Sequence, residues 1–461
     1  MYHVRLLVAG LAIFAGTSGQ AETLADTMIK AYQLSPLLDA NRAALRGIDE
    51  GVAQARAGRR PQISAGASAR SNFDDDEGSR LDTYQVQLGA TLSLYDGGNS
   101  KAAIESAKAG VLAARAQLVD VEQTVLLQAV TAYMDVRRDQ QFVSLGLNNV
   151  SVLEQQVRAA TDRFELGDIT RTDVSLAEAR LAAARASLAA ARGRLDASRE
   201  TYLAVVGIPA RNLQAPPTIP ALPPSLSDSE LIAMREHPGL NAARQSVTGA
   251  EWDLERAKSS SRPTLNAGAS VSVSRRDPTG AALNNSHDSN NSAELSLTGN
   301  LPLYTGGRNS SLVRQAQTFV SQRKFELQNT ARQVRQEVAF AWSDRAVARA
   351  SIIANRQQVE AAQIAFNGVQ DEATLGSRTT LDVLDREQEL RDAQVQLASS
   401  IRDEYVAAYN LLAAMGLLTV QHLNLGIPVY DPHANYEKVQ KAPMNPSFSR
   451  KVDRIKGLYN N

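Results

Sequence analysis

The chain has 461 residues and no cysteine. Disulfides, thiolate metal sites and thiol redox chemistry are therefore excluded, and so is lipidation at a cysteine. The 49 lysines and arginines balance the 49 aspartates and glutamates, so the overall charge offers no attraction for nucleic acid. After the first residues, no apolar run approaches the roughly 18 residues of a membrane-spanning helix. If this chain crosses a membrane, strands must do so.

Sequence patterns of catalysis are also missing. The histidines beyond the N-terminal segment are scattered and lack the spacing of a metal site; they are His237, His287, His422 and His433. The sequence contains no nucleophile elbow, phosphate-binding loop or dinucleotide fingerprint. We therefore predict that the protein is not an enzyme and uses no cofactor and no metal.

Residues 1–21 have the pattern of a secretory signal peptide. His3 and Arg5 form a short basic start, Leu6–Ala15 is apolar, and small residues up to Ala21 form a cleavage site. The apolar run is too short for a membrane span of about 20 residues. The sequence therefore predicts export.

The rest of the sequence contains the same unit twice. Leu92–Gly98 reads LSLYDGG and returns as LPLYTGG at Leu301–Gly307. The offset is 301 − 92 = 209, and Gly207 and Gly416 keep it. Roughly 115 residues therefore align without insertion, which indicates a tandem duplication.

Upstream of this stretch the offset is smaller. Pro36 pairs with Pro238 and Pro61 with Pro263, at 238 − 36 = 202 and 263 − 61 = 202. The second copy has therefore gained 209 − 202 = 7 residues between Pro263 and Tyr304. A length that varies in one short stretch alone marks that stretch as an exposed loop.

Most of the mature chain has the composition and period of helix. Apolar residues recur every seven positions, as at Val174, Leu181, Leu188, Leu195 and Tyr202. This spacing is typical of coiled-coil packing, and an ordinary antiparallel bundle is the alternative. The predicted long helices span 99–166 and 170–206 in the first copy and 308–375 and 379–415 in the second. Shorter helices at 24–57 and 228–258 lead into each copy.

Two hairpins of strands, at about 62–95 and 264–304, interrupt the helices. Apolar side chains such as Val86 and Leu88 alternate with polar ones such as Gln85 and Gln87. Each run has the length and pattern of a transmembrane β-strand. The loops are rich in Asp (Asp74 to Glu77) and Asn (284–292), which suits an outer surface, and the acidic loop lacks the spacing of a calcium-binding EF-hand.

Four strands cannot close a barrel, and open strand edges are not tolerated in lipid, so the chain must oligomerise. The sequence thus predicts a mainly α fold with a transmembrane β-barrel completed by several copies. The predicted divisions are a signal peptide (1–21), a first repeat (22–214), a Pro-rich linker (215–227), a second repeat (228–416), and an equatorial segment with a loosely ordered C-terminal tail (417–461).

The chain resembles outer-membrane factors of the TolC family over nearly its whole mature length. The resemblance rests on the duplicated Tyr-x-Gly-Gly junctions and on the duplicated turns at Leu166-Gly167 and Leu375-Gly376. Each junction joins a strand to a long helix; its residues are Tyr95, Gly97 and Gly98, and Tyr304, Gly306 and Gly307. A glycine at 167 and at 376 supplies the positive φ that ends a helix.

The resemblance implies a homotrimer with a twelve-stranded barrel in outer-membrane lipid and a twelve-helix α-barrel tunnel. Such a trimer lies in the outer membrane of a Gram-negative bacterium and extends roughly 100 Å into the periplasm. Its expected partners are a periplasmic adaptor and an inner-membrane pump of the ABC or RND type. Nucleic acid is not an expected partner.

In this family the helix turns at the periplasmic end form the gate. The resemblance implies that Arg378 bonds to Asp173 and holds the turns closed, and that Asp382 and Asp385 form two rings of carboxylates that favour cations. A tyrosine frequent in the family is Ala373 here, which puts one contact of the gate in doubt. The alternative is that these are solvated charges near a helix N-terminus.

The predicted function is a passive exit duct for a type I protein secretion or multidrug efflux system. The alternative is a periplasmic coiled-coil adaptor or scaffold without a pore. Adaptors also carry long helical hairpins, but they do not need two amphipathic strand hairpins. The sequence leaves open whether the cargo is a secreted protein or a drug.

Overall fold

The computed structural model describes residues 22–74, 79–279, 288–375 and 377–441. The expected signal peptide at 1–21, Gly376, parts of both strand loops (75–78 and 280–287) and the end of the C-terminal tail (442–461) lie outside the described residues.

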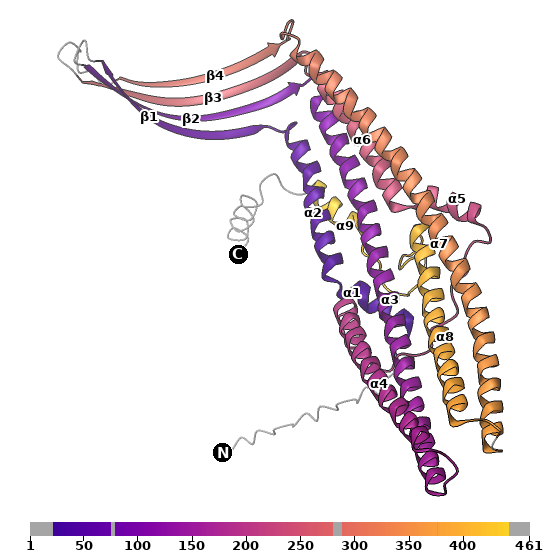
Figure 1. Cartoon of the computed structure of the whole chain (residues 1–461). Helices are drawn as coiled ribbons and strands as arrows, with labels where there is room; N and C mark the ends of the chain where they lie inside the picture. The colour runs from indigo at the N-terminus through magenta and orange to yellow at the C-terminus, as the bar shows by residue number, and fades with distance from the viewer. Residues whose placement is uncertain (1–21, 75–78, 280–287, 376, 442–461) are drawn as a thin grey trace, which may run out of the picture. The chain divides into compact units, whose positions relative to one another are not determined.

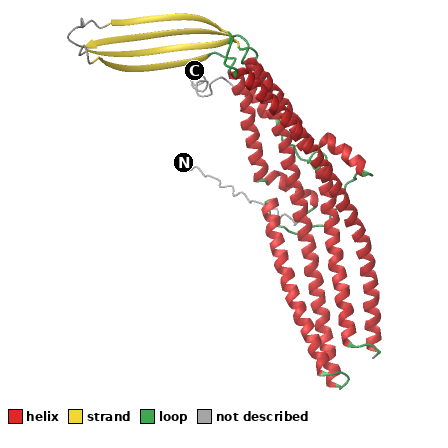
Figure 2. Cartoon of the chain, turned by 45° about the horizontal axis from the view of Figure 1, so that its top comes forward, coloured by secondary structure: helices red, strands yellow, loops and turns green. Residues whose placement is uncertain are grey.

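The described chain is mainly helical, with four antiparallel strands, and this confirms the predicted mainly α fold with four strands per chain (Figures 1 and 2). The helices are α1 (Leu24–Leu34), α2 (Pro36–Ala57), α3 (Asn99–Glu165), α4 (Arg171–Val206), α5 (Leu226–Glu236), α6 (Pro238–Ser259), α7 (Arg308–Thr374), α8 (Thr380–Ala414) and α9 (His433–Lys441). The strands are β1 (Gln62–Asp74), β2 (Ser79–Tyr95), β3 (Thr264–Thr279) and β4 (Asp288–Asn300). None of the described helices combines the length and apolar character that crossing a bilayer requires.

Contacts divide the chain into two compact units, and each draws segments from both repeats. One unit contains the turns between α3 and α4 and between α7 and α8; it comprises Met1–Pro36, Glu122–Ser229 and Val338–Ile427. The other contains the sheet, and it comprises Leu37–Val121, Glu230–Glu337 and Pro428–Asn461. The two repeats are therefore not separate domains.

The four strands form one sheet in the order β1-β2-β3-β4 (Figure 1). Residues directly opposite in an antiparallel pair lie on the same face of a sheet. Ala65 faces Leu88, Leu88 also faces Val271, and Ala269 faces Leu295. The register therefore gathers the apolar positions of all four strands on one face. This face is open to solvent in the single chain, since Leu295 is 89% exposed.

Two of the expected helices are each broken by a proline. The sequence predicted single helices at 24–57 and 228–258, but α1 ends before Pro36 and α5 ends before Pro238. Proline disfavours a helical residue before it, and Ser35 (ψ 114°) and His237 (ψ 123°) are accordingly non-helical. Each proline then starts the next helix, where its missing N–H costs nothing.

Two further elements differ from the prediction. The strand expected to reach residue 304 ends at Asn300, because β3 begins at Thr264 and offers no partner beyond this point. The chain from Asp431 is not loosely ordered up to residue 441, because it forms α9. Asn435 donates a hydrogen bond of 2.8 Å to the buried Asp49 of α2, and Arg115 of α3 contacts His433 at 3.1 Å.

Candidate functional site

The turn between α3 and α4 is fixed by backbone geometry and a capping box. Gly167 has φ +81°, and the N–H of Asp168 donates to the carbonyl of Arg163 at 2.9 Å. Thr170 caps α4, and its N–H and hydroxyl both donate to the carboxylate of Asp173, at 3.0 and 2.8 Å. The carboxylate of Asp173 thus acts first as a cap of its own helix.

The turn between α7 and α8 repeats this arrangement. Thr379 caps α8, and its N–H and hydroxyl donate to Asp382 at 3.0 and 2.8 Å. Arg378 precedes the cap, so it lies in the turn and not on α8. Its Nε donates to the carboxylate of Glu372, near the end of α7, at 2.8 Å.

Both capping carboxylates are ionised at neutral pH. Hydrogen bonds from the side chain and the backbone of Thr170 lower the pKa of Asp173. The backbone and hydroxyl of Thr379 lower the pKa of Asp382, with a further contribution from Arg378. The hydrogen bond to Glu372 raises the pKa of Arg378. Two negative charges therefore mark the starts of α4 and α8.

The predicted Arg378–Asp173 ion pair is not formed within the chain, because Arg378 pairs with Glu372 and Asp173 with Thr170. A different pair joins the two helical hairpins. Arg180 of α4 donates to Asp385 of α8 at 2.9 Å. Sequence reasoning missed Arg180, although it lies seven residues beyond Asp173, on the same helix.

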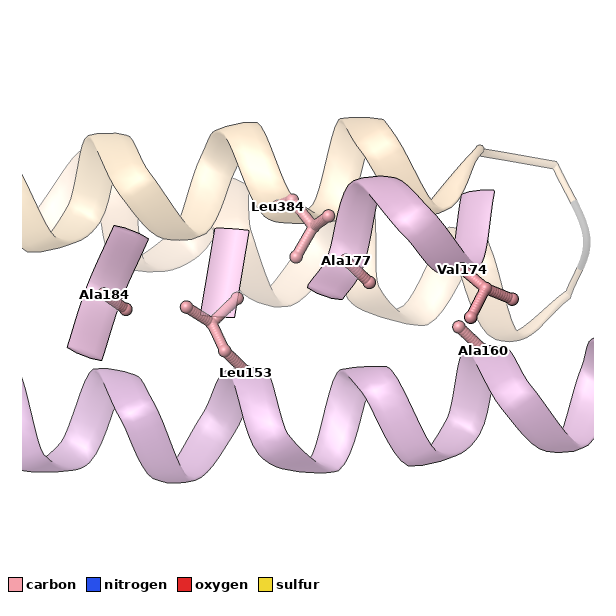
Figure 3. Close-up of a cluster of buried hydrophobic side chains, with 6 residues drawn as sticks. All are labelled: Leu153, Ala160, Val174, Ala177, Ala184 and Leu384. Atoms are coloured by element: carbon pink, nitrogen blue, oxygen red, sulfur yellow. The ribbon is translucent and has the colours of Figure 1, made fainter. Parts of the chain in front are cut away.

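A second polar contact and an apolar cluster join the same helices. Arg391 of α8 donates to the hydroxyl of Ser187 of α4 at 2.8 Å. Figure 3 shows the cluster, in which Leu384 of α8 lies among side chains of α3 and α4. Its members are Leu153, Ala160, Val174, Ala177, Ala184 and Leu384. Four of the six are alanine or valine, so the helices approach closely and bury little area per residue.

Glu387 is a buried carboxylate that the sequence analysis did not select. Its side chain is on the core side of α8, 7% exposed, and its Oε2 has no hydrogen-bond partner among the described residues. Burial raises its pKa to about 7, and Arg391 opposes this shift. The signal in the sequence was a glutamate between Val383 and Leu390, in a seam of otherwise apolar positions.

The two strand-to-helix junctions have the same backbone and different surroundings. Positive φ values occur at Gly97 (+66°), Gly98 (+95°), Gly306 (+62°) and Gly307 (+84°). At the first junction Arg262 Nη1 donates to the carbonyl of Gly97 at 2.9 Å, and Tyr95 is 51% exposed. At the second, a Cβ on either glycine would meet no described atom within 4 Å, and Tyr304 is 89% exposed.

The described residues contain no group of three or more His, Asp or Glu side chains placed to hold a metal ion. The arrangement offers hydrogen-bonded turns, fixed charges and apolar faces. These are elements for positioning helices.

Comparison with known proteins identifies relatives of the whole chain. A family model described as outer membrane efflux protein matches residues 29–207 and 232–417. Outer membrane efflux protein BepC of Brucella suis biovar 1 (strain 1330) is 36% identical over 440 residues, covering 94% of this chain and 95% of BepC. Outer membrane protein TolC of Escherichia coli (strain K12) is 27% identical and covers 90% of this chain and 87% of TolC.

Relatives and solved structures of lower sequence identity are also similar to this chain. Alkaline protease secretion protein AprF of Pseudomonas aeruginosa is 24% identical, over 78% of this chain and 74% of AprF. Among solved structures, the outer membrane protein VceC of Vibrio cholerae superposes with a TM-score of 0.71 at 21% identity, covering 85% of this chain and 96% of VceC. The VceC likeness supports the fold.

Gly97→Ala tests the packing of the first junction. A Cβ at Gly97 would lie 2.8 Å from Cβ of Arg262, and a φ of +66° disfavours alanine. We expect a clear fall in the thermal midpoint of the purified protein, from about 1–2 kcal/mol of backbone strain plus the clash. Gly167→Ala is the matched control, since its φ is +81° and no described atom lies within 4 Å. Equal losses in both variants would contradict the packing role.

Glu387→Gln tests the buried carboxylate. The raised pKa means that the folded state holds this proton more tightly than the unfolded state. The stability it contributes is therefore full below its ordinary pKa of 4.5 and is lost as pH rises through about 7. We expect the thermal midpoint of the wild type to decrease as the pH is raised from about 5 to about 8. At about pH 8, Glu387→Gln should have a free energy of unfolding about 3 kcal/mol higher than that of the wild type.

The exposed Glu389, paired with Arg386, offers the control Glu389→Gln on the same helix. The thermal midpoint of Glu389→Gln should depend on pH in the same way as that of the wild type. A Glu387→Gln profile parallel to that of the wild type would show that this carboxylate is not the group that titrates.

Proposed function

Because the chain belongs to the outer membrane efflux protein family and lies in the outer membrane of a Gram-negative bacterium, reaching into the periplasm, we propose that it is the passive exit duct of a tripartite transport system. The observation that carries the proposal is the sheet, whose register gathers apolar side chains from four strands on one solvent-open face. A periplasmic adaptor without a pore has no use for such a face, whereas a membrane-inserted wall requires it.

The duct is a homotrimer in this proposal. Four strands per chain are too few for a closed barrel, and three copies supply twelve. The long helices α3, α4, α7 and α8 of three copies form the wall of the periplasmic tunnel. Outer-membrane lipid covers the apolar face of the sheet.

The energy for transport comes from elsewhere. The sequence contains no phosphate-binding loop for a nucleotide. We assign this task to an inner-membrane pump of the ABC or RND type, joined to the duct by a periplasmic adaptor. Relatives named for efflux and for protease secretion support a role in transport.

The gate is formed by the turns at the ends of the long helices. The contact between Arg180 and Asp385 joins the two helical hairpins of one copy, so it restrains their separation. Arg378 stabilises its own turn through Glu372. Under three-fold symmetry, Asp382 forms a ring of three charges that favours cations.

The cargo is a protein or a small molecule. The relatives include proteins named for efflux and proteins named for secretion. BepC is an efflux protein, and AprF serves secretion of alkaline protease. The turn at Leu166–Val174 resembles members that serve type I secretion. Cargo selection then belongs to the pump, because a lumen of small polar side chains discriminates weakly.

Arg180→Ala tests the gate. An exposed ion pair contributes about 0.5 kcal/mol, so three symmetric pairs give about 1.5 kcal/mol, or roughly tenfold in the ratio of open to closed channels. We expect a rise of this order in the open probability measured in planar bilayers. Arg185→Ala is the matched control, because Arg185 pairs with Glu154 inside one hairpin, at 2.9 Å. If the open probability of Arg180→Ala equals that of the wild type, or if both variants raise it equally, the Arg180–Asp385 pair does not restrain the gate.

Deletion of the gene tests the function and separates the two kinds of cargo. The culture supernatant proteome of the deletion strain is compared with that of its parent and of a complemented strain. Loss of one or a few secreted proteins identifies a type I exporter. An unchanged secretome with raised drug susceptibility identifies an efflux duct. If neither changes and the protein forms no heat-modifiable oligomer in the outer-membrane fraction, the duct proposal fails.

A further inference from the structure

A cavity of about 400 Å³ lies between α3 and α8. Met134 and Leu145 of α3 and Leu397 and Ile401 of α8 line it, and Pro216, from the segment after α4, completes its apolar wall. All these residues belong to the compact unit that contains the helix turns. Cavities of ~300–1,000 Å³ with apolar walls and a few polar groups are typical of sites for small molecules.

Three arginines also line this cavity, namely Arg137 and Arg138 of α3 and Arg402 of α8. Two of them are held by carboxylates. Arg138 pairs with Asp139 at 2.8 Å, and Arg402 pairs with Asp135 at 2.8 Å. These ion pairs compensate the charges of both guanidinium groups and hold them in place.

Arg137 has no such compensation. Its Nη1 donates to the carbonyl oxygen of Leu213 at 2.9 Å, and no carboxylate pairs with it among the residues that the structure describes. A carbonyl oxygen carries no net charge, and a guanidinium has five N–H donors. The charge of Arg137 and most of its donors are therefore available to a ligand in the cavity.

The other copy of the repeat lacks these cations. Adding 209 converts Arg137 to Ala346, and subtracting 209 converts Arg402 to Gly193. Both repeats nevertheless form the same pair of long helices. The packing of the helices therefore does not require an arginine at these positions, and the positive charge is particular to this one cavity.

We propose that the cavity binds a small amphipathic anion, with a compact apolar body and one carboxylate, sulfonate or phosphate group. The body lies against Leu397 and Ile401, and the anionic group accepts hydrogen bonds from Arg137. Hydrogen bonds between ionised groups are roughly twice as strong as those between neutral groups. A neutral ligand of the same shape binds less tightly, because it removes water from the guanidinium without compensating its charge.

A ligand in this cavity also joins the two helical hairpins. It contacts α3 of the first hairpin and α8 of the second, as the Arg180–Asp385 pair joins α4 to α8. The bound anion therefore restrains the separation of the hairpins and favours the closed gate. This second part of the inference rests on the proposed gated duct, whereas the binding site does not.

Calorimetry with naphthalene-2-sulfonate tests the site. The purified protein in lipid nanodiscs is titrated with this anion and with neutral naphthalene-2-sulfonamide, and empty nanodiscs serve as the blank. We expect Arg137→Gln to weaken binding of the sulfonate about tenfold and to leave binding of the sulfonamide nearly unchanged. The matched control is Arg194→Gln, because Arg194 lies over the ring of Phe142 of α3 and does not line the cavity.

Ala398→Phe tests the cavity itself without changing Arg137. Ala398 lines the cavity, so a phenyl ring at this position fills the space and should abolish binding of both naphthalene compounds. This variant also covers the case in which Arg137→Gln disturbs the segment at Leu213. If the wild type binds no sulfonate, or if Ala398→Phe binds it equally well, the site is wrong. If the sulfonamide binds the wild type as tightly as the sulfonate does, the preference for an anion is wrong.

Planar bilayers test the effect on the gate. We expect naphthalene-2-sulfonate to lower the open probability of wild-type and Arg194→Gln channels and to leave that of Ala398→Phe unchanged. An equal fall in Ala398→Phe shows direct block of the pore and overturns the restraint. Binding in calorimetry with no change in open probability also overturns the restraint, while the site stands. A protein that forms no channel contradicts the proposed duct and leaves the calorimetric result as it is.

Discussion

The backbone of the two edge strands is the constraint on which the other features depend. In lipid no water is available for an open N–H or C=O group, so β1 and β4 need partners that the described chain does not supply. The apolar face, the early end of β4 at Asn300 and the open turn at Gly306 all lie on or beside this incomplete sheet. In the proposed trimer, neighbouring copies supply the partners of both edge strands.

The duplication gives one chain two similar units that pack on each other. The second repeat lies against the first near Gly249, and its Arg262 donates to the carbonyl of Gly97. The repeats differ in length only by the seven residues that the second has gained between Pro263 and Tyr304. Both repeats keep glycines of positive φ at their strand-to-helix junctions.

The helix turns combine rigid local structure with weak cross-links. Capping boxes at Thr170 and Thr379 fix the start of α4 and α8, while an exposed ion pair and an alanine-rich cluster hold the hairpins together. Ion pairs of this exposure contribute little individually. In the proposed gate, the hairpins therefore separate while their turns stay folded.

Much of this protein could be predicted from its sequence, because periods and turn chemistry are local. The alternation of apolar and polar residues predicted the two faces of the strands, and the heptad spacing predicted the buried side of α4. Gly167 and Thr170 predicted the turn between α3 and α4. Proline signals at Pro36 and Pro238 were also local, and their effect on the helices was missed. The partners of charged side chains could not be predicted, because they depend on which helices become neighbours. Only the tertiary structure joined Arg180 to Asp385 and buried Glu387, since both depend on which helices pack against α8. The pairing of Arg378 with Glu372, six residues apart, depends on the conformation of the turn between α7 and α8.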